Sequence, residues 1–222
     1  MKICAMSDLH GVLPQIQECD VVCICGDFSP IEFDRNVSKV EEWVNLEFFP
    51  WIKNLPCSKV ILTPGNHDWI TWVKQPEDIQ TWIQNENLQD KLIYLVNSEY
   101  VYEDVRFFGC PYVSRLPHWP YYTWDGHEYE DIPENTDILL THAAPSIGDV
   151  GLDMSIPREL GSIHLANVVR ARPNIKYHFC GHIHDGSHRI HTIENTSIIN
   201  VSILDDNYEL TYPEFYINYV KN

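Results

Sequence analysis

Near the start of the chain stand Lys2-Ile3-Cys4-Ala5-Met6 and then Ser7-Asp8-Leu9-His10, an apolar run that ends at a polar motif. Runs of about four to eight apolar residues bounded by Gly or Pro are typical of buried strands. The same pattern recurs at 21–25 before Gly26-Asp27, 59–63 before Pro64-Gly65-Asn66, 137–140 before Thr141-His142, and 175–180 before Gly181-His182. We therefore predict five buried strands, each with a polar motif at its carboxyl end.

Segments with helical spacing of apolar residues separate these strands. They are 37–55, 77–88 after the helix-opening Pro76, and 157–170. Two hairpins are also predicted, at 100–108 with a turn near Glu103-Asp104, and at 188–193 with 197–201 around Glu194-Asn195. This alternation predicts an α/β fold in which two mixed sheets pack face to face with helices outside. The sequence contains no repeat or linker, so we expect residues 1–222 to form a single domain.

The composition limits the classes of partner and the compartment. The formal net charge is −17, and such an acidic surface disfavours long nucleic acids, which bind basic side chains. No window approaches the roughly 20 apolar residues of a membrane helix, so no membrane partner is expected. The N-terminus reaches Asp8 too soon for a signal peptide, and seven cysteines without a C-x-x-C pair are typical of free thiols. A cytoplasmic location is therefore predicted.

Seven side chains at the ends of the predicted strands can bind metal ions: Asp8, His10, Asp27, Asn66, His142, His182 and His184. Because ligands bind beyond the carboxyl ends of strands in open α/β sheets, we expect these side chains to converge. In an extended backbone Asp8 and His10 point to the same side and can hold one metal, and His182 and His184 have the same spacing. Asp27 can bridge two metals. Oxygen and imidazole ligands suit Mn, Fe, Zn or Ni, so we predict two divalent metal ions, with Mn favoured.

This set of ligands predicts hydrolysis of a phosphoester. Two metals roughly 3.5–4 Å apart can activate a bridging hydroxide for in-line attack on phosphorus and neutralise the charge on its oxygens. His67 follows Asn66 and can face the substrate, so we expect it to be the catalytic residue that protonates the leaving oxygen. Asp68 is a candidate to orient His67.

The motifs, taken in order, resemble those of the calcineurin-like metallophosphoesterase family, from Met1 to about Val201. The matching motifs are Asp8-Leu9-His10, Gly26-Asp27, Gly65-Asn66-His67-Asp68, Thr141-His142 and Gly181-His182-Ile183-His184. Segments 26–29, 132–142 and 180–186 are also similar to the small metallophosphoesterase-domain proteins of the animal brain-type branch and their bacterial relatives.

The resemblance implies a four-layer αββα sandwich, the metallo-dependent phosphatase fold, in which two mixed β-sheets lie between helices. It also implies that His67 lies beside the leaving group and that Asp27 binds both metals. The remaining ligands would divide into Asp8, His10 and His184 for one metal, and Asn66, His142 and His182 for the other. Family members of this size often hydrolyse phosphodiesters.

We therefore predict a dinuclear metal-dependent phosphohydrolase, most specifically a phosphodiesterase acting on small phosphodiesters or nucleotides. The alternatives are a phosphomonoesterase with the same metal site and a non-catalytic metal-binding scaffold. A nuclease is disfavoured by the charge.

Protein serine/threonine phosphatases of this superfamily carry Asp-Arg-Gly in the second motif. Here Gly26-Asp27 is followed by Phe28-Ser29-Pro30, and the nearest arginine is Arg35. Protein phosphatase activity is therefore not expected.

The segment 111–131 is rich in aromatic residues, and two interpretations of it are open. It can form a lid that stacks a nucleobase, or a loop packed on the body or on a second subunit of a homo-oligomer. Arg115, His118 and His127 lie in this segment and can contact a phosphate, although a surface position explains the two histidines more simply.

Overall fold

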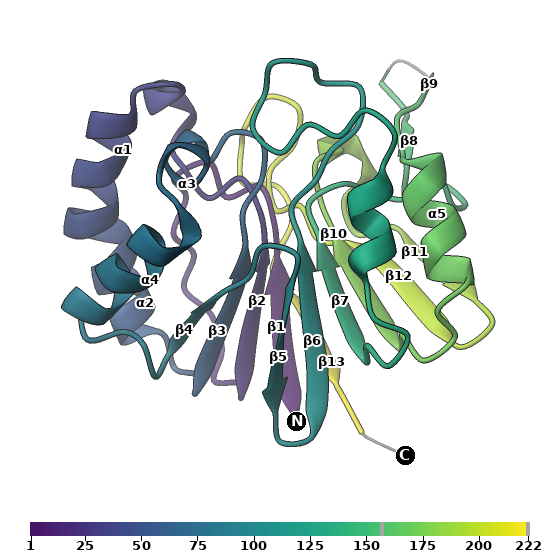
Figure 1. The fold of residues 1–222 in the computed structure, drawn as a ribbon, viewed down its shortest axis with the longest axis horizontal. Coiled ribbons are helices and arrows are strands. Elements are labelled where there is room, and N and C mark those ends of the chain that lie inside the picture. Colours follow the sequence, from purple (N-terminus) through teal and green to yellow (C-terminus); the bar gives the residue numbers. More distant parts are fainter. Residues whose placement is uncertain (156–157, 221–222) are drawn as a thin grey trace.

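The protein forms four layers, with two β-sheets between outer helices (Figure 1). The structure is a computed structural model and describes residues 1–155 and 158–220. The first sheet has the order β13-β1-β2-β3-β4, which are Phe215–Asn218, Lys2–Met6, Val21–Cys25, Lys59–Thr63 and Leu92–Tyr94. The second has the order β11-β12-β10-β7-β6-β5, which are Ile190–Ile193, Thr196–Asn200, Tyr177–Cys180, Ile138–Thr141, Val105–Cys110 and Ser98–Tyr102. The predicted sandwich of two mixed sheets is confirmed.

The predicted apolar runs form the centre of each sheet. Strands β1 to β4 are parallel to one another, and so are β6, β7, β10 and β12. Antiparallel strands lie at sheet edges, with β13 beside β1 and the hairpin strands β5 and β11 beside β6 and β12. The sequence did not predict β4 and β13, because β4 has only three residues and β13 has no fully buried residue.

Three hydrophobic clusters hold the layers together. Alternate residues of a strand face opposite sides of its sheet. In β2, Val22 and Ile24 face the helices on the first sheet, whereas Val21 and Cys23 face the second sheet. The third cluster packs the outer face of the second sheet against α5 (Ile163–Arg170). Both faces of β2 are therefore covered, which explains its continuous apolar sequence.

The cysteines contribute to this packing as free thiols. All seven lack a disulfide bond, and every one except Cys57 is buried. Cys25 and Cys180 belong to the hydrophobic clusters, where they act as small packing residues. Among the described helices, none combines the length and the apolar character that a bilayer-spanning segment requires.

The predicted helix 37–55 is present as one continuous segment of α1, a π-helical turn and α2, which span Val37–Trp43, Val44–Phe48 and Phe49–Asn54. Asn36 caps the segment, because its side-chain oxygen accepts the Lys39 N–H at 3.2 Å. The wide π-helical turn comes just before Pro50, which has no amide hydrogen to donate to an α-helical bond.

Two helices follow β3. The predicted helix 77–88 is present as α4 (Pro76–Asn85), which confirms that a helix opens at Pro76. The short helix α3 (Trp69–Val73) was not predicted, and it begins directly after the motif 65–68. This helix carries the chain away from the carboxyl end of β3.

The predicted helix 157–170 begins later than expected, as α5. Ser162 caps α5, because its hydroxyl oxygen accepts the Leu165 N–H at 3.2 Å. Before this cap, β9 (Arg158–Glu159) pairs with β8 (Leu152–Asp153), so the predicted helix start is wrong. Pro157 itself lies outside the described residues.

The two sheets meet at the carboxyl ends of β1 and β12. The Ser7 N–H donates to the Val201 carbonyl at 2.9 Å, and the Ile203 N–H donates to the Ser7 carbonyl at 3.1 Å. The Val201 N–H also donates to the Cys180 carbonyl at 2.8 Å. The loops that follow β1 and β10 therefore lie side by side, at the upper edge of the sandwich in Figure 1.

Candidate metal centre

The loops after parallel strands of both sheets bring predicted ligands together. Asp8 follows β1, Asp27 follows β2, Asn66 follows β3, His142 follows β7, and His182 follows β10. Asp8 forms two groups, one with His10 and His184 and one with Asp27 and His142, and within each group the ligand atoms all lie within 4.8 Å of one another. The two groups are adjacent because they share the Asp8 carboxylate.

The first group lies between β1 and β10. Nε2 of His184 is 3.4 Å from Oδ1 of Asp8, and the rings of His184 and His10 are 5.3 Å apart. Nδ1 of His184 donates to the Asp205 carbonyl at 3.0 Å, which leaves Nε2 available to a metal. Burial lowers the pKa of His10 to about 4, and among the described residues its buried Nδ1 has no hydrogen-bond partner. A neutral imidazole with an unpaired buried nitrogen is suited to bind a cation.

The second group lies around His142. Its Nε2 is 3.1 Å from Oδ2 of Asp27 and 3.0 Å from Oδ1 of Asn66. Its Nδ1 donates to the Cys25 carbonyl at 2.9 Å, so Nε2 again faces the ligand atoms. The His182 ring lies 5.0 Å from the His142 ring, and burial lowers the pKa of His182 to about 4. Asn66 and His182 thus join this group from separate loops.

The charges in the two groups are paired. Burial alone would raise the pKa values of Asp8 and Asp27, but His184 lowers the pKa of Asp8 and His142 lowers that of Asp27. Against the effect of burial, these carboxylates raise the pKa values of His184 and His142. Divalent cations would replace the protons on these imidazoles. The chemistry of the donors therefore fits a dinuclear divalent metal site.

The backbone at these ligands is a set of tight turns, and not the extended chain that the spacing argument assumed. The φ angles are +56° at Asp8, +41° at His10, +52° at Asp27 and +69° at His182, all in the left-handed region. Such conformations are uncommon for residues other than glycine and cluster at functional sites. Asp8 and His10 still share one group, but His182 faces His142 while His184 faces His10. The equal spacing of the two pairs therefore does not place His182 and His184 in the same group.

Two glycines allow these loops to approach one another. A Cβ atom at Gly65 would collide with Oδ1 of Asp27, and one at Gly181 would collide with the side chains of Ser7 and Asp8. The Ser202 hydroxyl also donates to Oδ2 of Asp8 at 2.5 Å. The glycines in the motifs are thus required by close packing around the two carboxylates.

His67 lies at the mouth of the site, between the first group and Asp34. Its backbone N–H donates to Oδ1 of Asp27 at 2.7 Å, and its ring is 5.0 Å from the His10 ring. Nδ1 of His67 lies 3.2 Å from Oδ1 of Asp34, which also accepts a bond from Nε1 of Trp69 at 3.0 Å. Asp34 was not among the residues predicted from the sequence. The Asp34-Arg35 pair matches the first two residues of the Asp-Arg-Gly sequence of the protein phosphatases and was the available signal.

Asp68 does not orient His67, so that prediction is corrected. Its buried carboxylate accepts the N–H groups of Asp27, Ser29 and Gly65 at 2.9, 3.0 and 2.8 Å, and the Ser29 hydroxyl at 2.7 Å. Burial, together with the charge of Asp27, raises the pKa of Asp68 to about 6. Asp68 therefore ties the loop after β2 to the loop after β3, and it acts on the ligands through the backbone.

A cavity of about 280 Å³ opens over the metal centre. His10, Asp27, Asn66, His67, His182 and His184 line it together with Leu116, Trp119, Asp153, Leu160, Ile183, Asp206 and Tyr208. Arg115, His118 and His127 of segment 111–131 were predicted as possible phosphate contacts. Arg115 donates from Nη1 to the Glu159 carbonyl at 2.5 Å and lines a different cavity. His118 is exposed, and Nδ1 of exposed His127 is 2.8 Å from Oδ1 of Asp125. None of these three residues lies in the described lining of the metal-centre cavity.

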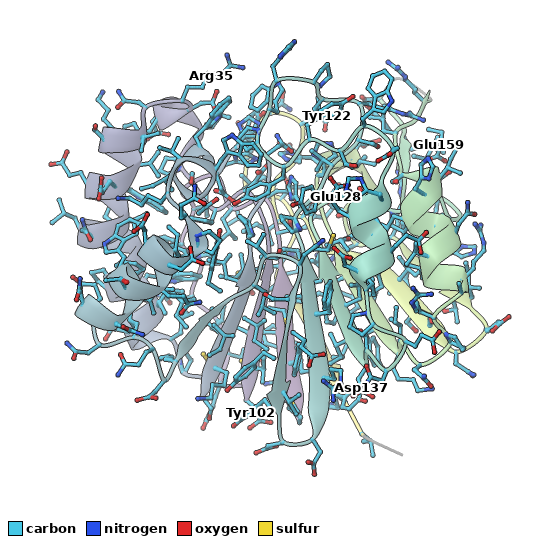
Figure 2. All side chains as sticks on the ribbon, in the orientation of Figure 1. Arg35, Tyr102, Tyr122, Glu128, Asp137 and Glu159 are labelled. Carbon is cyan, nitrogen blue, oxygen red and sulfur yellow. The ribbon has the colours of Figure 1, made fainter. Side chains whose placement is uncertain are left out.

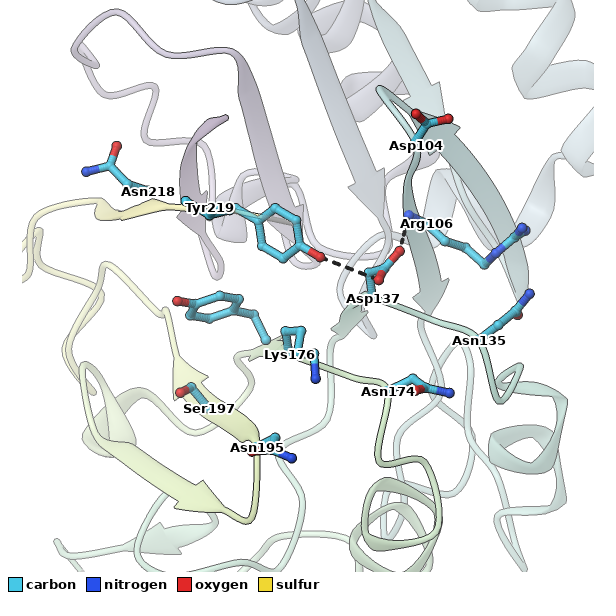
Figure 3. Close-up of a pocket in the computed structure, with 12 residues that line it drawn as sticks. Asp104, Arg106, Asn135, Asp137, Asn174, Lys176, Asn195, Ser197, Asn218 and Tyr219 are labelled. Carbon is cyan, nitrogen blue, oxygen red and sulfur yellow. Dashed lines mark hydrogen bonds between the residues drawn. The ribbon is translucent and has the colours of Figure 1, made fainter. Parts of the chain in front are cut away.

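A larger cavity of about 790 Å³ lies at the opposite end of the sheets (Figure 3). Figure 2 shows Tyr102 and Asp137 at that end, far from Arg35 and Tyr122. The Tyr219 hydroxyl reaches Oδ1 of Asp137 at 3.4 Å. The described lining of this larger cavity contains none of the predicted site residues, so it is separate from the metal-centre cavity.

The four-layer fold, with paired groups of carboxylates and imidazoles where its sheets meet, defines the class of metallophosphoesterases. The family model for calcineurin-like phosphoesterases matches residues 1–186, and the chain belongs to this family. The resemblance found in the sequence is thereby confirmed, and with it the class of phosphoric ester hydrolases.

Individual relatives agree with this assignment. The chain is 28% identical to human metallophosphoesterase domain-containing protein 1 over 243 residues, which cover 98% of this chain and 70% of that protein. It is 27% identical over 219 residues to a UPF0046 protein from Caenorhabditis elegans, covering 92% and 74% of the two chains. A dimetal phosphatase from Danio rerio has a similar structure, with a TM-score of 0.56 and 12% identity over 94% of this chain and 88% of that one. This last likeness supports the fold alone.

Proposed function

We propose that the chain is a phosphodiesterase that hydrolyses small phosphodiesters or nucleotides with two divalent metal ions, Mn being the first candidate. The observation that carries the proposal is the charge of the metal-centre cavity. Its described lining contains Asp153 and Asp206 but neither Lys nor Arg. A phosphomonoester carries about 1.5 to 2 negative charges near neutral pH, whereas a diester carries one. Because the described lining holds no lysine or arginine, the metals would have to balance the charge of the substrate, and this favours the diester.

The residues around the cavity have separate tasks in this proposal. When bound, the metal ions supply Lewis acidity and lower the pKa of water. The two groups that share Asp8 would hold them, with Asn66 and His182 beside the second group and Asp27 within reach of both. His67 donates a proton to the leaving oxygen, and Asp34 orients its ring. Asp68 holds the loop of Asp27 against the loop of Asn66.

Comparison of two substrates tests the proposal against a phosphomonoesterase, which would use the same metals and the same His67. The Mn-reconstituted protein is assayed with bis-para-nitrophenyl phosphate and with para-nitrophenyl phosphate. We expect a higher kcat/KM for the diester, and a higher value for the monoester would contradict the proposal. Asp27→Ala, which should hydrolyse neither, controls for contaminating phosphatases.

The non-catalytic scaffold is the second candidate function. It is disfavoured because the seven predicted ligands and His67 are all present and border one site. A scaffold has no need for a histidine held by a carboxylate at the mouth of such a site. Absence of hydrolysis of diesters and monoesters after loading with Mn, Fe, Zn or Ni would favour the scaffold.

We also propose a reducing compartment, the cytoplasm, for this activity. The seven free thiols support that location, because disulfides are rare there. Detection of the protein in an oxidising compartment, with disulfide bonds, would contradict it.

A further inference from the structure

On the basis of the proposed phosphodiesterase function, we propose that Trp119 is a stacking surface for the leaving group. The site would then select phosphodiesters whose leaving alcohol carries a flat aromatic ring system, such as a nucleoside. Aromatic side chains stack on any nucleobase, because every base has a π-face. The position of Trp119, its support and the charge around it each point to this role.

Trp119 lies on the His67 side of the cavity. The two ring centroids are 4.7 Å apart with an interplanar angle of 57°, and the half-buried Trp119 side chain lines the cavity. Because His67 is the proposed proton donor, the group attached to the leaving oxygen emerges beside Trp119. The other aromatic ring of the cavity, Tyr208, lies against His10 and His184, at 4.9 and 5.3 Å. The two rings therefore border different parts of a bound diester.

The Trp119 ring lies against Trp69 and Arg35, which both contact Asp34, the partner of His67. Its centroid is 5.8 Å from that of Trp69, and the Arg35 guanidinium carbon lies 4.8 Å from the Trp119 centroid and 5.1 Å from the Trp69 centroid. Trp69 in turn donates to Asp34, the carboxylate that contacts His67. A cation over the two indoles holds them in place. The stacking surface and the proton donor are thus fixed relative to one another.

The segment 111–131 is anchored to the body through two of its aromatic residues, Tyr121 and Tyr129. The buried Tyr121 hydroxyl donates to the Thr71 hydroxyl at 2.9 Å and lies 3.2 Å from the Tyr94 hydroxyl. The Tyr129 hydroxyl donates to the Tyr112 carbonyl at 3.0 Å. These two rings pack on the body. Among the aromatic residues of the segment, Trp119 is the one in the described lining of the metal-centre cavity. A ring held in this way loses little freedom when a base stacks on it.

The charge of the cavity limits the rest of the substrate. Asp153 and Asp206 lie in its lining, and Arg35 is already engaged with the two indoles and with Asp34, at 3.5 Å. Additional phosphates would bring more negative charge beside these carboxylates, and the described lining contains neither Lys nor Arg. The chemistry therefore selects a nucleoside diester with a single phosphate.

Methyl adenosine 5′-phosphate tests the proposal, because one molecule offers two leaving groups. A water molecule supplies the hydroxide that becomes bonded to phosphorus, and its other proton goes to solvent. If the bond to O5′ breaks and O5′ takes the His67 proton, the products are adenosine and methyl phosphate. If the bond to the methoxy oxygen breaks, the products are methanol and adenosine monophosphate. We expect the Mn-loaded protein to release mainly adenosine, and an excess of adenosine monophosphate would overturn the proposal.

Substitution of Trp119 should change this product ratio. Trp119→Ala is expected to lower the ratio of adenosine to adenosine monophosphate about 5- to 100-fold, as for the loss of one stacking contact, whereas Trp119→Phe should keep most of it. Trp124→Ala is the matched control, because Trp124 lies in the same segment but is 87% exposed and lines another cavity. Loss of folded protein or of metal does not alter a ratio measured within one substrate. An unchanged ratio in Trp119→Ala would overturn the proposal.

Binding of adenosine to the chelator-treated protein gives a readout without turnover. Wild-type protein and Trp124→Ala should bind adenosine about 5- to 100-fold more tightly than Trp119→Ala in an NMR titration. Equal affinities would overturn the stacking role. If no diester is hydrolysed with any metal while binding still depends on Trp119, the phosphodiesterase function fails and Trp119 remains a nucleoside-stacking residue. The two failures are therefore distinguishable.

Discussion

Nδ1 of His67 lies 3.2 Å from Oδ1 of Asp34, and this contact decides which nitrogen of His67 faces the cavity. A carboxylate oxygen accepts the hydrogen on Nδ1, so Nε2 is the nitrogen left for the substrate, and in the doubly protonated ring it can give its proton to the leaving oxygen. Asp34 follows the short 3₁₀ helix Ile31–Phe33, in the loop that begins with Asp27. One loop therefore supplies both a metal-centre carboxylate and the partner of the proton donor.

Asp34→Asn is expected to lower kcat about 10–100-fold with little change in KM, because an amide no longer fixes one tautomer of His67. Elemental analysis should show an unchanged metal content, since Asp34 belongs to neither ligand group. The exposed Asp90, substituted as Asp90→Asn, serves as the control. An unchanged kcat in Asp34→Asn would mean that His67 needs no orienting partner.

His67→Ala is expected to slow turnover about 10²–10⁴-fold, the usual range for loss of a general acid. The effect should be largest for diesters with poor leaving alcohols, which depend most on protonation. Metal binding should be preserved, because alanine keeps the backbone N–H that donates to Oδ1 of Asp27 at 2.7 Å. Steady-state kinetics on several diesters, with metal analysis of the same samples, checks both expectations. Turnover equal to that of the wild type would remove His67 from the mechanism.

Asp27→Ala should abolish binding at both metal positions. Oδ2 of Asp27 lies 3.8 Å from Nε2 of His10 and 3.1 Å from Nε2 of His142, so one carboxylate reaches both groups. Its removal leaves Asp8 as the one carboxylate of the two described groups to balance two divalent cations. Elemental analysis after dialysis against Mn measures the result. Two metals per chain in this variant would contradict the bridging role.

Treatment with EDTA should silence hydrolysis, and added Mn should restore it. Metal that binds only the folded chain also stabilises that chain, so the melting temperature should fall on chelation and rise again on reconstitution. Differential scanning calorimetry of both forms, beside the activity assay, measures this. Activity that survives thorough chelation would indicate chemistry without a metal.

His178 should make the folded state sensitive to acid. Its imidazole is buried in β10 with Nε2 2.7 Å from the Thr141 hydroxyl oxygen, and burial lowers its pKa from 6.5 to about 3. The unfolded chain binds more protons between these two values, so the stability from this group is present above about pH 6.5 and is lost as the pH falls toward 3. From about pH 7 to pH 5 this group should cost about 2 kcal/mol of the free energy of unfolding.

His178→Leu should remove this part of the pH dependence, as measured by urea unfolding at several pH values. The Thr141 hydroxyl stays paired in the variant, because it donates to the Ala143 carbonyl at 2.6 Å. Substitution of the exposed His164 on α5 as His164→Leu is the control. Equal pH slopes for wild type and His178→Leu would show that His178 is not the group that titrates.

The order of strands and motifs could be predicted because both depend on local sequence. A buried parallel strand must be apolar on both faces, and the runs 2–6, 21–25 and 59–63 are apolar at almost every position. Residues after such strands must emerge at one edge of the sheet, so Asp8, Asp27 and Asn66 had to be neighbours. The sequence therefore contained the fold class, the predicted ligands and His67.

The tertiary structure decided how these side chains are divided and supported. The left-handed turns at Asp8 and His182, and the separation of His182 from His184, depend on loops of two sheets that pack against each other through Gly181. Asp34 and Trp119 reach His67 from distant parts of the chain. Sequence spacing does not determine where a side chain in a loop points, because its orientation depends on contacts with residues far away in the chain. For this reason the candidate ligands could be located from the motifs, while the partner of His67 and the ring beside it could not.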